Sequence, residues 1–385
     1  MMTMKRATFK TGLTCAFLAA LLALSACSST DEKVAAYMEP DPGKSIGLEK
    51  SWSRSIGSDA DEYFQHPGVI AISGKDVYVG TYGGKVARVS LDEGRTAWDA
   101  DLDTEVSGGV ALGPEQVFVG TAEGEMVALS RSNGEQLWRT RVSTKVASAP
   151  RYAEGRVFFT TLDNRTFALN AQNGERLWVH QSVPEPLVVM GAAQPTVEDG
   201  VVYVGYSSGE VFALAARDGA TRWSVNLMIL GGRSEVDRLQ DVDAALIISD
   251  RKILAVNHQG SIAAIDKETG RRIWRQKFSG IRKPLLKSGR IYVSNMDGTL
   301  AAISEEGGSV LWSSVLSDGV LTAPAMVGGK LMVADDKGRL FAVEPRRGEV
   351  VGLDQLDDPV YGDPRALAGS GLLLWTNDGN LIRYN

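Results

Sequence analysis

The chain has 385 residues, of which 44% are hydrophobic and 23% charged, and it contains 42 glycines, 8 tryptophans and 2 cysteines. This composition is typical of a globular protein and excludes a disordered, collagen-like or disulfide-rich chain. The 41 Lys and Arg residues are outnumbered by 47 Asp and Glu residues, which gives a formal net charge of −6. A nucleic-acid partner is therefore not expected, since there is no basic excess to neutralise a phosphate backbone.

The first 26 residues have the features of a secretory signal. Lys5, Arg6 and Lys10 form a cationic start, and an uncharged apolar run at 13–24 is too short to span a bilayer. Small residues directly before Cys27 resemble the bacterial lipobox, which implies cleavage before Cys27 and lipidation of its sulfur. An ordinary signal followed by a coincidental cysteine is the alternative. We expect a signal peptide at 1–26 and a flexible, lipidated tether at 27–44.

A five-residue motif of glycine, three variable residues and tryptophan recurs at intervals of about forty residues. Its copies end at Trp98, Trp138, Trp178, Trp223, Trp274 and Trp312. A seventh copy, which begins at Gly348, has Gly352 in place of the tryptophan. Repetition at this period indicates a repeat architecture in which each unit packs on the next.

Two short runs of alternating apolar residues precede the repeated motif, as at 117–120 and 125–129. Turns such as Asp297-Gly298 and Asp378-Gly379 separate such runs, which is typical of β-hairpins. Eight hairpins start at Val77, Val117, Val157, Val201, Ile253, Ile291, Leu331 and Leu372. The pattern predicts an all-β fold, an eight-bladed β-propeller with four antiparallel strands per blade.

The ends of the chain predict how this propeller closes. The hairpin that starts at Leu372 is followed by the end of the sequence, Asn385, before any fourth strand. The segment 48–52, by contrast, resembles a fourth strand with no hairpin before it. We therefore expect the N-terminal strand to complete the eighth blade, in a single domain at 45–385.

The repeated tryptophans could form an aromatic site for a quinone or a sugar. Their fixed place in successive units favours core packing instead, because a ligand needs one site whereas a repeating core needs one packing residue per unit. Calcium is also not expected, since single acidic residues at turns are ordinary and calcium requires six or more converging oxygens. No Ser-His-Asp, phosphate-loop or zinc pattern is evident. We expect no catalytic residue, no metal and no cofactor.

The repeat resembles that of the quinoprotein alcohol dehydrogenases, which hold pyrroloquinoline quinone and calcium, but the mature chain lacks their adjacent cysteine pair. A lipoprotein signal joined to one such propeller, together with the acidic segment 235–243, resembles the BamB family. This resemblance implies a non-catalytic scaffold of the outer-membrane β-barrel assembly (BAM) complex, which binds the periplasmic POTRA domains of BamA and supports barrel insertion. It also implies anchoring through Cys27 at the periplasmic face of the outer membrane. Exposed outer strands are further candidates for β-augmentation by unfolded barrel proteins, although any propeller offers such edges.

The spacing of the tryptophans predicts where the partner binds. The interval is 40 residues from Trp98 to Trp138, but 45 from Trp178 to Trp223 and 51 from Trp223 to Trp274. The additional residues lie at 183–191 and 229–243, in connections between blades. Equivalent connections of a propeller leave from one face, so two adjacent enlarged loops predict one binding surface.

The first enlarged loop is apolar at 186–190, and the second carries charged residues. An apolar patch beside charged residues is typical of a protein interface. The resemblance assigns contact with BamA to the positions of five residues, and Arg238 belongs to the same charged segment. The predicted partner-binding residues are Leu187, Val189, Met190, Arg238, Asp241 and Asp243.

Other interpretations stay open at this point. The apolar side chains could fold beneath the first loop, and the charges could pair within the second. The main alternative function is a periplasmic quinoprotein dehydrogenase or ligand-binding propeller, and a propeller that binds another cell-envelope protein is a further one.

Overall fold

The computed structural model describes residues 43–57, 70–183, 192–227, 242, 245–257, 260–278, 280 and 282–385. The chain divides into two compact units, Met1–Ala36 and Tyr37–Asn385, and every described residue belongs to the second. The predicted signal, Cys27 and nearly all of the predicted tether lie outside the described residues, so the division into signal, tether and propeller stays a prediction.

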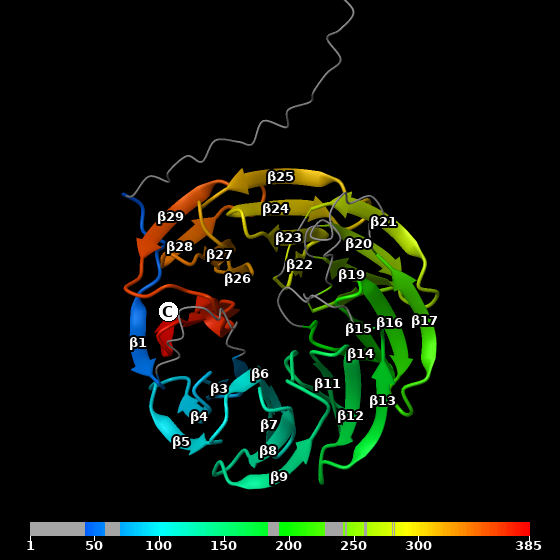
Figure 1. Cartoon of the computed structure of the whole chain (residues 1–385). Helices are drawn as coiled ribbons and strands as arrows, with labels where there is room; N and C mark the ends of the chain where they lie inside the picture. The colour runs from blue at the N-terminus through cyan, green and yellow to red at the C-terminus, as the bar shows by residue number, and fades with distance from the viewer. Residues whose placement is uncertain are drawn as a thin grey trace, which may run out of the picture. The chain divides into compact units, whose positions relative to one another are not determined.

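Eight four-stranded antiparallel sheets follow one another around a ring, which confirms the predicted eight-bladed propeller (Figure 1). The strands are given from the innermost outwards. Blade 1 consists of β2 (Ala71–Ser73), β3 (Asp76–Gly80), β4 (Lys85–Ser90) and β5 (Thr96–Asp101), and blade 2 of β6 (Val106–Leu112), β7 (Gln116–Thr121), β8 (Glu125–Ser130) and β9 (Gln136–Arg141). Blade 3 consists of β10 (Arg151–Ala153), β11 (Arg156–Thr161), β12 (Arg165–Asn170) and β13 (Arg176–Gln181), and blade 4 of β14 (Thr196–Glu198), β15 (Val201–Gly205), β16 (Glu210–Ala215) and β17 (Thr221–Asn226).

Blades 5 to 7 repeat this order, and blade 8 combines the two ends of the chain. Blade 5 consists of β18 (Ile247–Ser249), β19 (Lys252–Val256), β20 (Ser261–Asp266) and β21 (Arg272–Lys277), and blade 6 of β22 (Leu285–Lys287), β23 (Arg290–Ser294), β24 (Thr299–Ser304) and β25 (Val310–Val315). Blade 7 consists of β26 (Ala325–Val327), β27 (Lys330–Ala334), β28 (Arg339–Val343) and β29 (Val350–Gln355), and blade 8 of β30 (Arg365–Ala366), β31 (Leu372–Trp375), β32 (Asn380–Tyr384) and β1 (Lys50–Ser55). A short 3-10 turn, η2 (Ala368–Ser370), precedes β31. In the described residues no helix is long and apolar enough to cross a membrane.

The closure of the ring by the N-terminal strand is also confirmed. Strand β1 pairs antiparallel with β32, and Trp52 lies opposite Arg383. The backbone amides of Glu49 and Asn385 each donate to the carbonyl oxygen of the other, at 3.1 and 3.0 Å. The seam between the two ends of the chain is therefore held as an ordinary strand pair.

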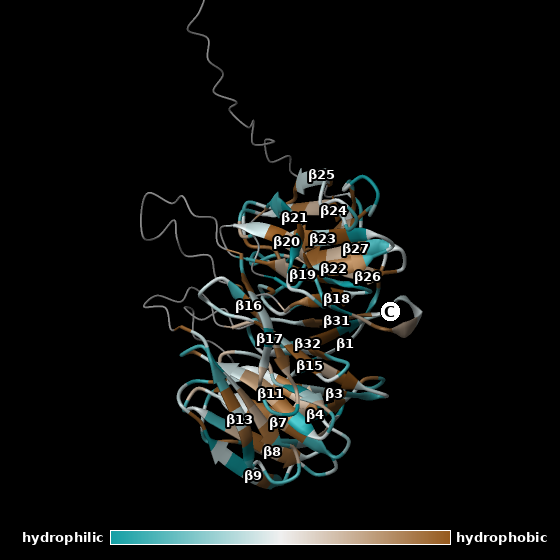
Figure 2. Ribbon diagram, turned by 90° about the vertical axis from the view of Figure 1, so that its right-hand side faces the viewer, coloured by the Kyte–Doolittle hydropathy of each residue, from teal (hydrophilic) through white to brown (hydrophobic). Residues whose placement is uncertain are grey.

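The core lies between neighbouring blades, because each sheet packs both of its faces. One cluster joins Val86 of blade 1 to Val117 and Val127 of blade 2, and similar clusters recur around the ring. All six residues of β7 are buried. Burial of both faces explains why the second and third strands have nearly continuous apolar sequences, which Figure 2 shows as hydrophobic strands inside the ring.

The repeated tryptophans form the junctions between blades, which supports the packing role expected for them. Each indole nitrogen donates to a backbone carbonyl of the next blade at 3.0 Å, and each ring covers the motif glycine of that blade. A Cβ atom on any of these glycines would lie within 2.8 Å of the neighbouring indole ring. Seven junctions in the described structure have this form, and they involve Trp52, Trp98, Trp138, Trp178, Trp223, Trp274 and Trp312.

The junction between blades 7 and 8 is different. Gly352 stands at the tryptophan position, and the N-terminal segment 43–48 covers it. Ile46 is only 1% exposed and joins the core of blades 7 and 8, while the amide of Leu353 donates to the carbonyl of Lys44 at 2.6 Å. The chain thus supplies the missing packing from its own N-terminal segment.

Candidate protein-binding face

The antiparallel order of the strands places two sets of connections on one face of the ring. The turns between the second and third strands of a blade leave at the same end as the connection from its fourth strand to the next blade. We call this end the loop face. The turn at 121–124 and the connection at 102–105 belong to it, as do both enlarged loops.

Regular connections on the loop face are short and have a common geometry. In the connection from blade 2 to blade 3, the amide of Val142 donates to Gly124 at 2.8 Å, and that of Val146 donates to Thr121 at 3.1 Å. Three residues separate these two anchor positions. Leu356 and Val360 make the equivalent bonds between blades 7 and 8, again with three residues between them.

The connection from blade 4 to blade 5 keeps both anchors. Leu227 donates to Gly209 at 2.9 Å and Val242 donates to Tyr206 at 3.2 Å, and both anchor side chains are fully buried. Fourteen residues, 228–241, separate them instead of three. The sequence placed this loop at 229–243, but Val242 belongs to the framework because its side chain packs against Gly205 as Val146 packs against Gly120.

The connection from blade 3 to blade 4 is anchored in the same way at its start. The amide of Ser182 donates to the carbonyl of Asn164 at 3.0 Å, and the Asn164 side-chain amide donates to the carbonyl of Val183 at 2.9 Å. The Val183 side chain is nevertheless 66% exposed. An apolar side chain therefore faces solvent where this loop leaves the ring. At the far end the loop re-enters the core at Ala193, which is fully buried.

The turn at 206–209 is the common base of both enlarged loops. Its backbone receives the amides of Leu227 and Val242 from the second loop. From the first loop, the Ser182 hydroxyl donates to Glu210 at 2.7 Å, and Glu210 also accepts from the Ser208 hydroxyl at 3.0 Å. The roots of the two loops thus lie beside each other, next to this turn of blade 4.

An aromatic cluster packs against Tyr206 of this turn. The hydroxyl of Tyr206 lies 3.0 Å from His180 Nδ1 and 2.7 Å from the Thr166 hydroxyl, and the His180 ring packs on Phe212 with centroids 4.8 Å apart. Burial lowers the pKa of His180 and raises that of Tyr206. Both side chains are therefore neutral near pH 7 and act in packing. No sequence motif marks this cluster, because its residues come from different strands of blades 3 and 4.

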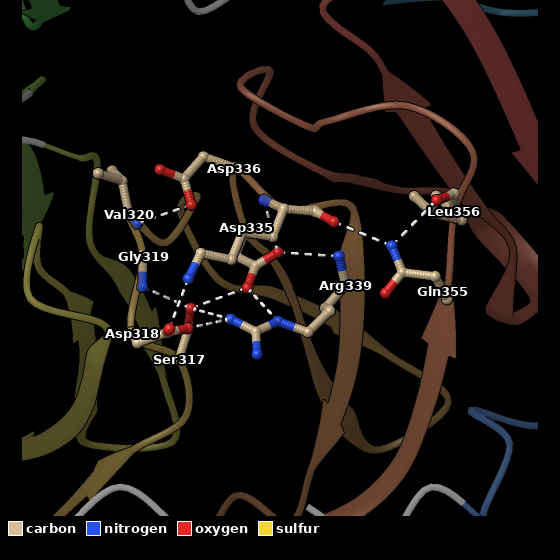
Figure 3. Close-up of polar contacts among 10 residues, drawn as sticks. Ser317, Asp318, Gly319, Val320, Asp335, Asp336, Arg339, Gln355 and Leu356 are labelled. Carbon is tan, nitrogen blue, oxygen red and sulfur yellow. Dashed lines mark hydrogen bonds and ion pairs between the residues drawn. The ribbon is translucent and has the colours of Figure 1, made fainter. Parts of the chain in front are cut away.

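The same face has a different character between blades 6 and 7 (Figure 3). The Arg339 guanidinium donates to the buried carboxylate of Asp335 at 2.7 Å and to that of Asp318 at 2.8 Å. Hydrogen bonds from Lys337 and Arg339 hold the pKa of Asp318 well below its usual value. The charges in this region are therefore paired with one another within the described residues.

All seven predicted site residues lie outside the described residues. They are Cys27, Leu187, Val189, Met190, Arg238, Asp241 and Asp243. The structure describes the roots of both loops and brings those roots together, whereas the assignment of the individual residues stays a prediction. No group of three or more metal-ligating side chains occurs among the residues that could be searched.

Comparisons with known proteins agree with the resemblance. The family model described as outer membrane protein assembly factor BamB matches residues 83–314 and 259–385. The chain is 43% identical to the BamB of Pseudomonas aeruginosa over 282 residues, which cover 72% of this chain and 73% of the relative. It is 39% identical to the Vibrio cholerae BamB over 142 residues, 37% of each chain.

Solved structures show the same fold. The crystal structure of BamB from Moraxella catarrhalis has a TM-score of 0.79 at 21% identity, over 88% of this chain and 99% of that one. A quinohemoprotein alcohol dehydrogenase from Pseudomonas putida has a TM-score of 0.73 at 12% identity, over 90% of this chain and 78% of that one. At these identities the likeness concerns the fold alone.

Proposed function

Because the chain belongs to the BamB family of outer membrane protein assembly factors, we propose that its two enlarged loops form the surface that binds BamA. The family consists of non-catalytic components of the BAM complex, which argues against the dehydrogenase alternative. In this proposal the ring is a rigid scaffold that presents the loops to the periplasmic POTRA domains of BamA and supports insertion of barrel proteins.

The observation that carries the proposal is the shared root of the two loops. Ser182 at the root of the first loop bonds to Ser208 and Glu210, and Leu227 and Val242 of the second loop bond to Gly209 and Tyr206, so the described roots of the two loops lie beside each other. Val183 already exposes an apolar side chain at the root of the first loop. An apolar centre with a charged rim is the usual organisation of a protein interface.

The proposed contact residues are those predicted from the sequence. Leu187, Val189 and Met190 would supply the apolar centre, and Arg238, Asp241 and Asp243 the charged rim. Such an interface typically depends on a few central residues, so single changes at its centre should have large effects.

Co-purification with full-length BamA from membranes tests this surface. We expect Leu187→Arg to reduce recovery of BamA about tenfold or more, since losing about 1.4 kcal/mol of binding free energy already has that effect. The double change Asp241→Arg with Asp243→Arg should also reduce recovery of BamA about tenfold or more. Unchanged recovery of BamA with either folded variant would reject this surface.

A matched control is available on the same face. Glu123 and Asp297 are exposed acidic residues at second-to-third strand turns of blades 2 and 6, away from the enlarged loops. The double change Glu123→Arg with Asp297→Arg alters the net charge by the same amount and should leave BamA recovery unchanged. Loss of BamA in this control would show that net charge, rather than the loops, controls the interaction.

We also propose that Cys27 carries the lipid that holds the protein at the periplasmic face of the outer membrane. The lipobox-like residues before Cys27 support this, together with the membership of an outer membrane assembly family. Cys27→Ser should move the protein from the membrane fraction to the soluble periplasmic fraction and abolish its labelling by palmitate. Retention of the label in this variant would contradict the assignment.

A further inference from the structure

A pocket of about 430 Å³ lies among the innermost strands of blades 6, 7 and 8, separate from the roots of the enlarged loops. Strands β22 and β26, which contribute to it, are the strands of their blades nearest the centre of the ring in Figure 1. Its lining includes Lys283, Pro324, Met326, Asp363 and Arg365. Lys283 and Asp363 each lie two residues before the start of an inner strand, β22 and β30 respectively, so they lie at the loop-face end of these strands.

Positive charge predominates around this pocket. Lys283 and Arg365 line it, Arg282 adjoins Lys283 in the chain, and Arg151 of blade 3 also acts electrostatically on Lys283. Among the described residues that line the pocket, Asp363 is the one carboxylate. The chain as a whole carries a formal charge of −6, so this excess of cations is a local feature.

Asp363 cannot balance these cations. Its Oδ1 lies 4.0 Å from Arg282 Nη1, which is the outer limit for an ion pair, and it already accepts the amide of Ala323 at 3.1 Å. The Arg282 side chain is only 4% exposed, and its Nε has no acceptor. A buried guanidinium normally has carboxylate partners and filled hydrogen bonds, because desolvation of an unpaired charge is costly.

Two further cations are unpartnered within the described residues. The Nε atom of Arg365 is buried without an acceptor. Burial lowers the pKa of Lys283, the charges of Arg365 and Arg151 lower it further, and Asp363 alone opposes them. Within the described residues, these cations therefore outnumber the carboxylates at the pocket.

We propose that this pocket binds an oxyanion, a phosphate or carboxylate group, between Lys283 and Arg365. Ammonium and guanidinium groups both bind oxyanions through charge-assisted hydrogen bonds, and the guanidinium plane suits two oxygens at once. Arg282 would contribute its charge from behind the pocket wall. Pro324 and Met326 would contact the apolar body of a larger ligand.

Inorganic phosphate is the probe for a direct test, with phosphorus NMR of the phosphate signal in the presence of the full chain at constant ionic strength. We expect saturable broadening that is weakened at least tenfold by Lys283→Met combined with Arg365→Met. The control, Lys75→Met with Arg217→Met, removes the same charges from exposed positions and should bind as the unaltered chain does. No saturable binding by the unaltered chain, or equal binding by the pocket variant, overturns the proposal.

Succinate distinguishes the two sources of the oxyanion. If succinate displaces phosphate, the site accepts carboxylates as well, and if it does not, the ligand class narrows to phosphates. Thermal unfolding supplies a second measurement, since phosphate should raise the Tm of the unaltered chain and not that of the pocket variant. Because Lys283 and Arg365 have no ion-pair partner within the described residues, the pocket variant should keep the Tm of the unaltered chain. Lys283→Gln provides a milder variant.

The proposed BamA surface and this pocket can be tested apart. The pocket variant should recover BamA fully, and Leu187→Arg should bind phosphate normally. Loss of phosphate binding in Leu187→Arg would contradict a separate site.

Discussion

Seven of the junctions between blades are packed by a tryptophan, whereas the junction between blades 7 and 8 is packed by the segment 43–48. At the junction from blade 2 to blade 3, Trp138 covers Gly174 and donates to the carbonyl of Ala171, both in the turn between the third and fourth strands of blade 3. Blade 8 has no such turn, because its third strand ends the chain and its fourth strand is β1. A tryptophan at position 352 would have neither a glycine to cover nor that carbonyl to bond.

The segment 43–48 replaces this contact. Ile46 enters the core between the two blades, and its backbone is held by Asp354 and Lys330 at 3.3 Å each. The difference teaches that the absence of tryptophan from the seventh motif follows from where the ring closes. It also means that one junction depends on a terminal segment, which can detach without opening a sheet, whereas the others depend on residues inside strands.

The largest effect is expected at a tryptophan junction. Trp138→Ala should lower the free energy of unfolding by about 3–5 kcal/mol, because it removes a large buried side chain and leaves a cavity over Gly174. Equilibrium denaturation in urea measures this loss. The neighbouring Leu137 is 50% exposed, so Leu137→Ala is the control and should change stability little. A loss below about 1 kcal/mol in Trp138→Ala would show that the junctions are not the main stabilising contacts.

A smaller and more local effect is expected at the junction of blades 7 and 8. Ile46→Asp should expel the segment 43–48 and lower the free energy of unfolding by about 2 kcal/mol, since detachment avoids burying the charge. Hydrogen exchange should then show loss of protection at the amide of Leu353, which bonds to Lys44, while amides of β28 stay protected.

The adjacent Ser45 is exposed, and Ser45→Asp serves as the control because its charge can stay in water. Protection lost throughout blades 7 and 8 in Ile46→Asp would contradict the local detachment expected for a terminal segment.

The smallest effect concerns the indole hydrogen bond alone. Trp138→Phe keeps an aromatic ring but leaves the carbonyl of Ala171 without its donor, which should cost about 1 kcal/mol. Trp52→Phe should cost less, because Arg383 also donates to the carbonyl of Leu91 that Trp52 bonds. Thermal or urea unfolding of the two variants side by side measures the difference. Equal losses would show that Arg383 does not compensate.

Much of the fold was predictable because it depends on a local pattern repeated many times. The tryptophan motif, the hairpins and the unpaired strand at 48–52 together predicted eight blades and their closure, and the structure confirms both. The existence of two enlarged connections was predictable from tryptophan spacing. The exact limits of these connections were not predictable. Val242 lies within the acidic segment of the sequence, and only its burial against Gly205 shows that it belongs to the propeller core.

The candidate sites were less predictable, because they join residues from different repeats. The turn at 206–209 and the adjoining Glu210 accept hydrogen bonds from Ser182, Leu227 and Val242, and no sequence motif marks these three residues. Arg282 and Asp363 are 81 positions apart, and no motif relates them.

The sequence by itself determined the number and order of the blades, since these follow from short-range alternation of apolar residues and from turn glycines, which act within one hairpin. It also determined which connections are enlarged. Only the tertiary structure decided that the roots of both loops lie beside one turn, that Ile46 takes the place of a tryptophan, and that Arg282, Lys283 and Arg365 gather at the inner strands. Those features depend on which blades become neighbours around the closed ring, and closure brings together residues that no local pattern relates.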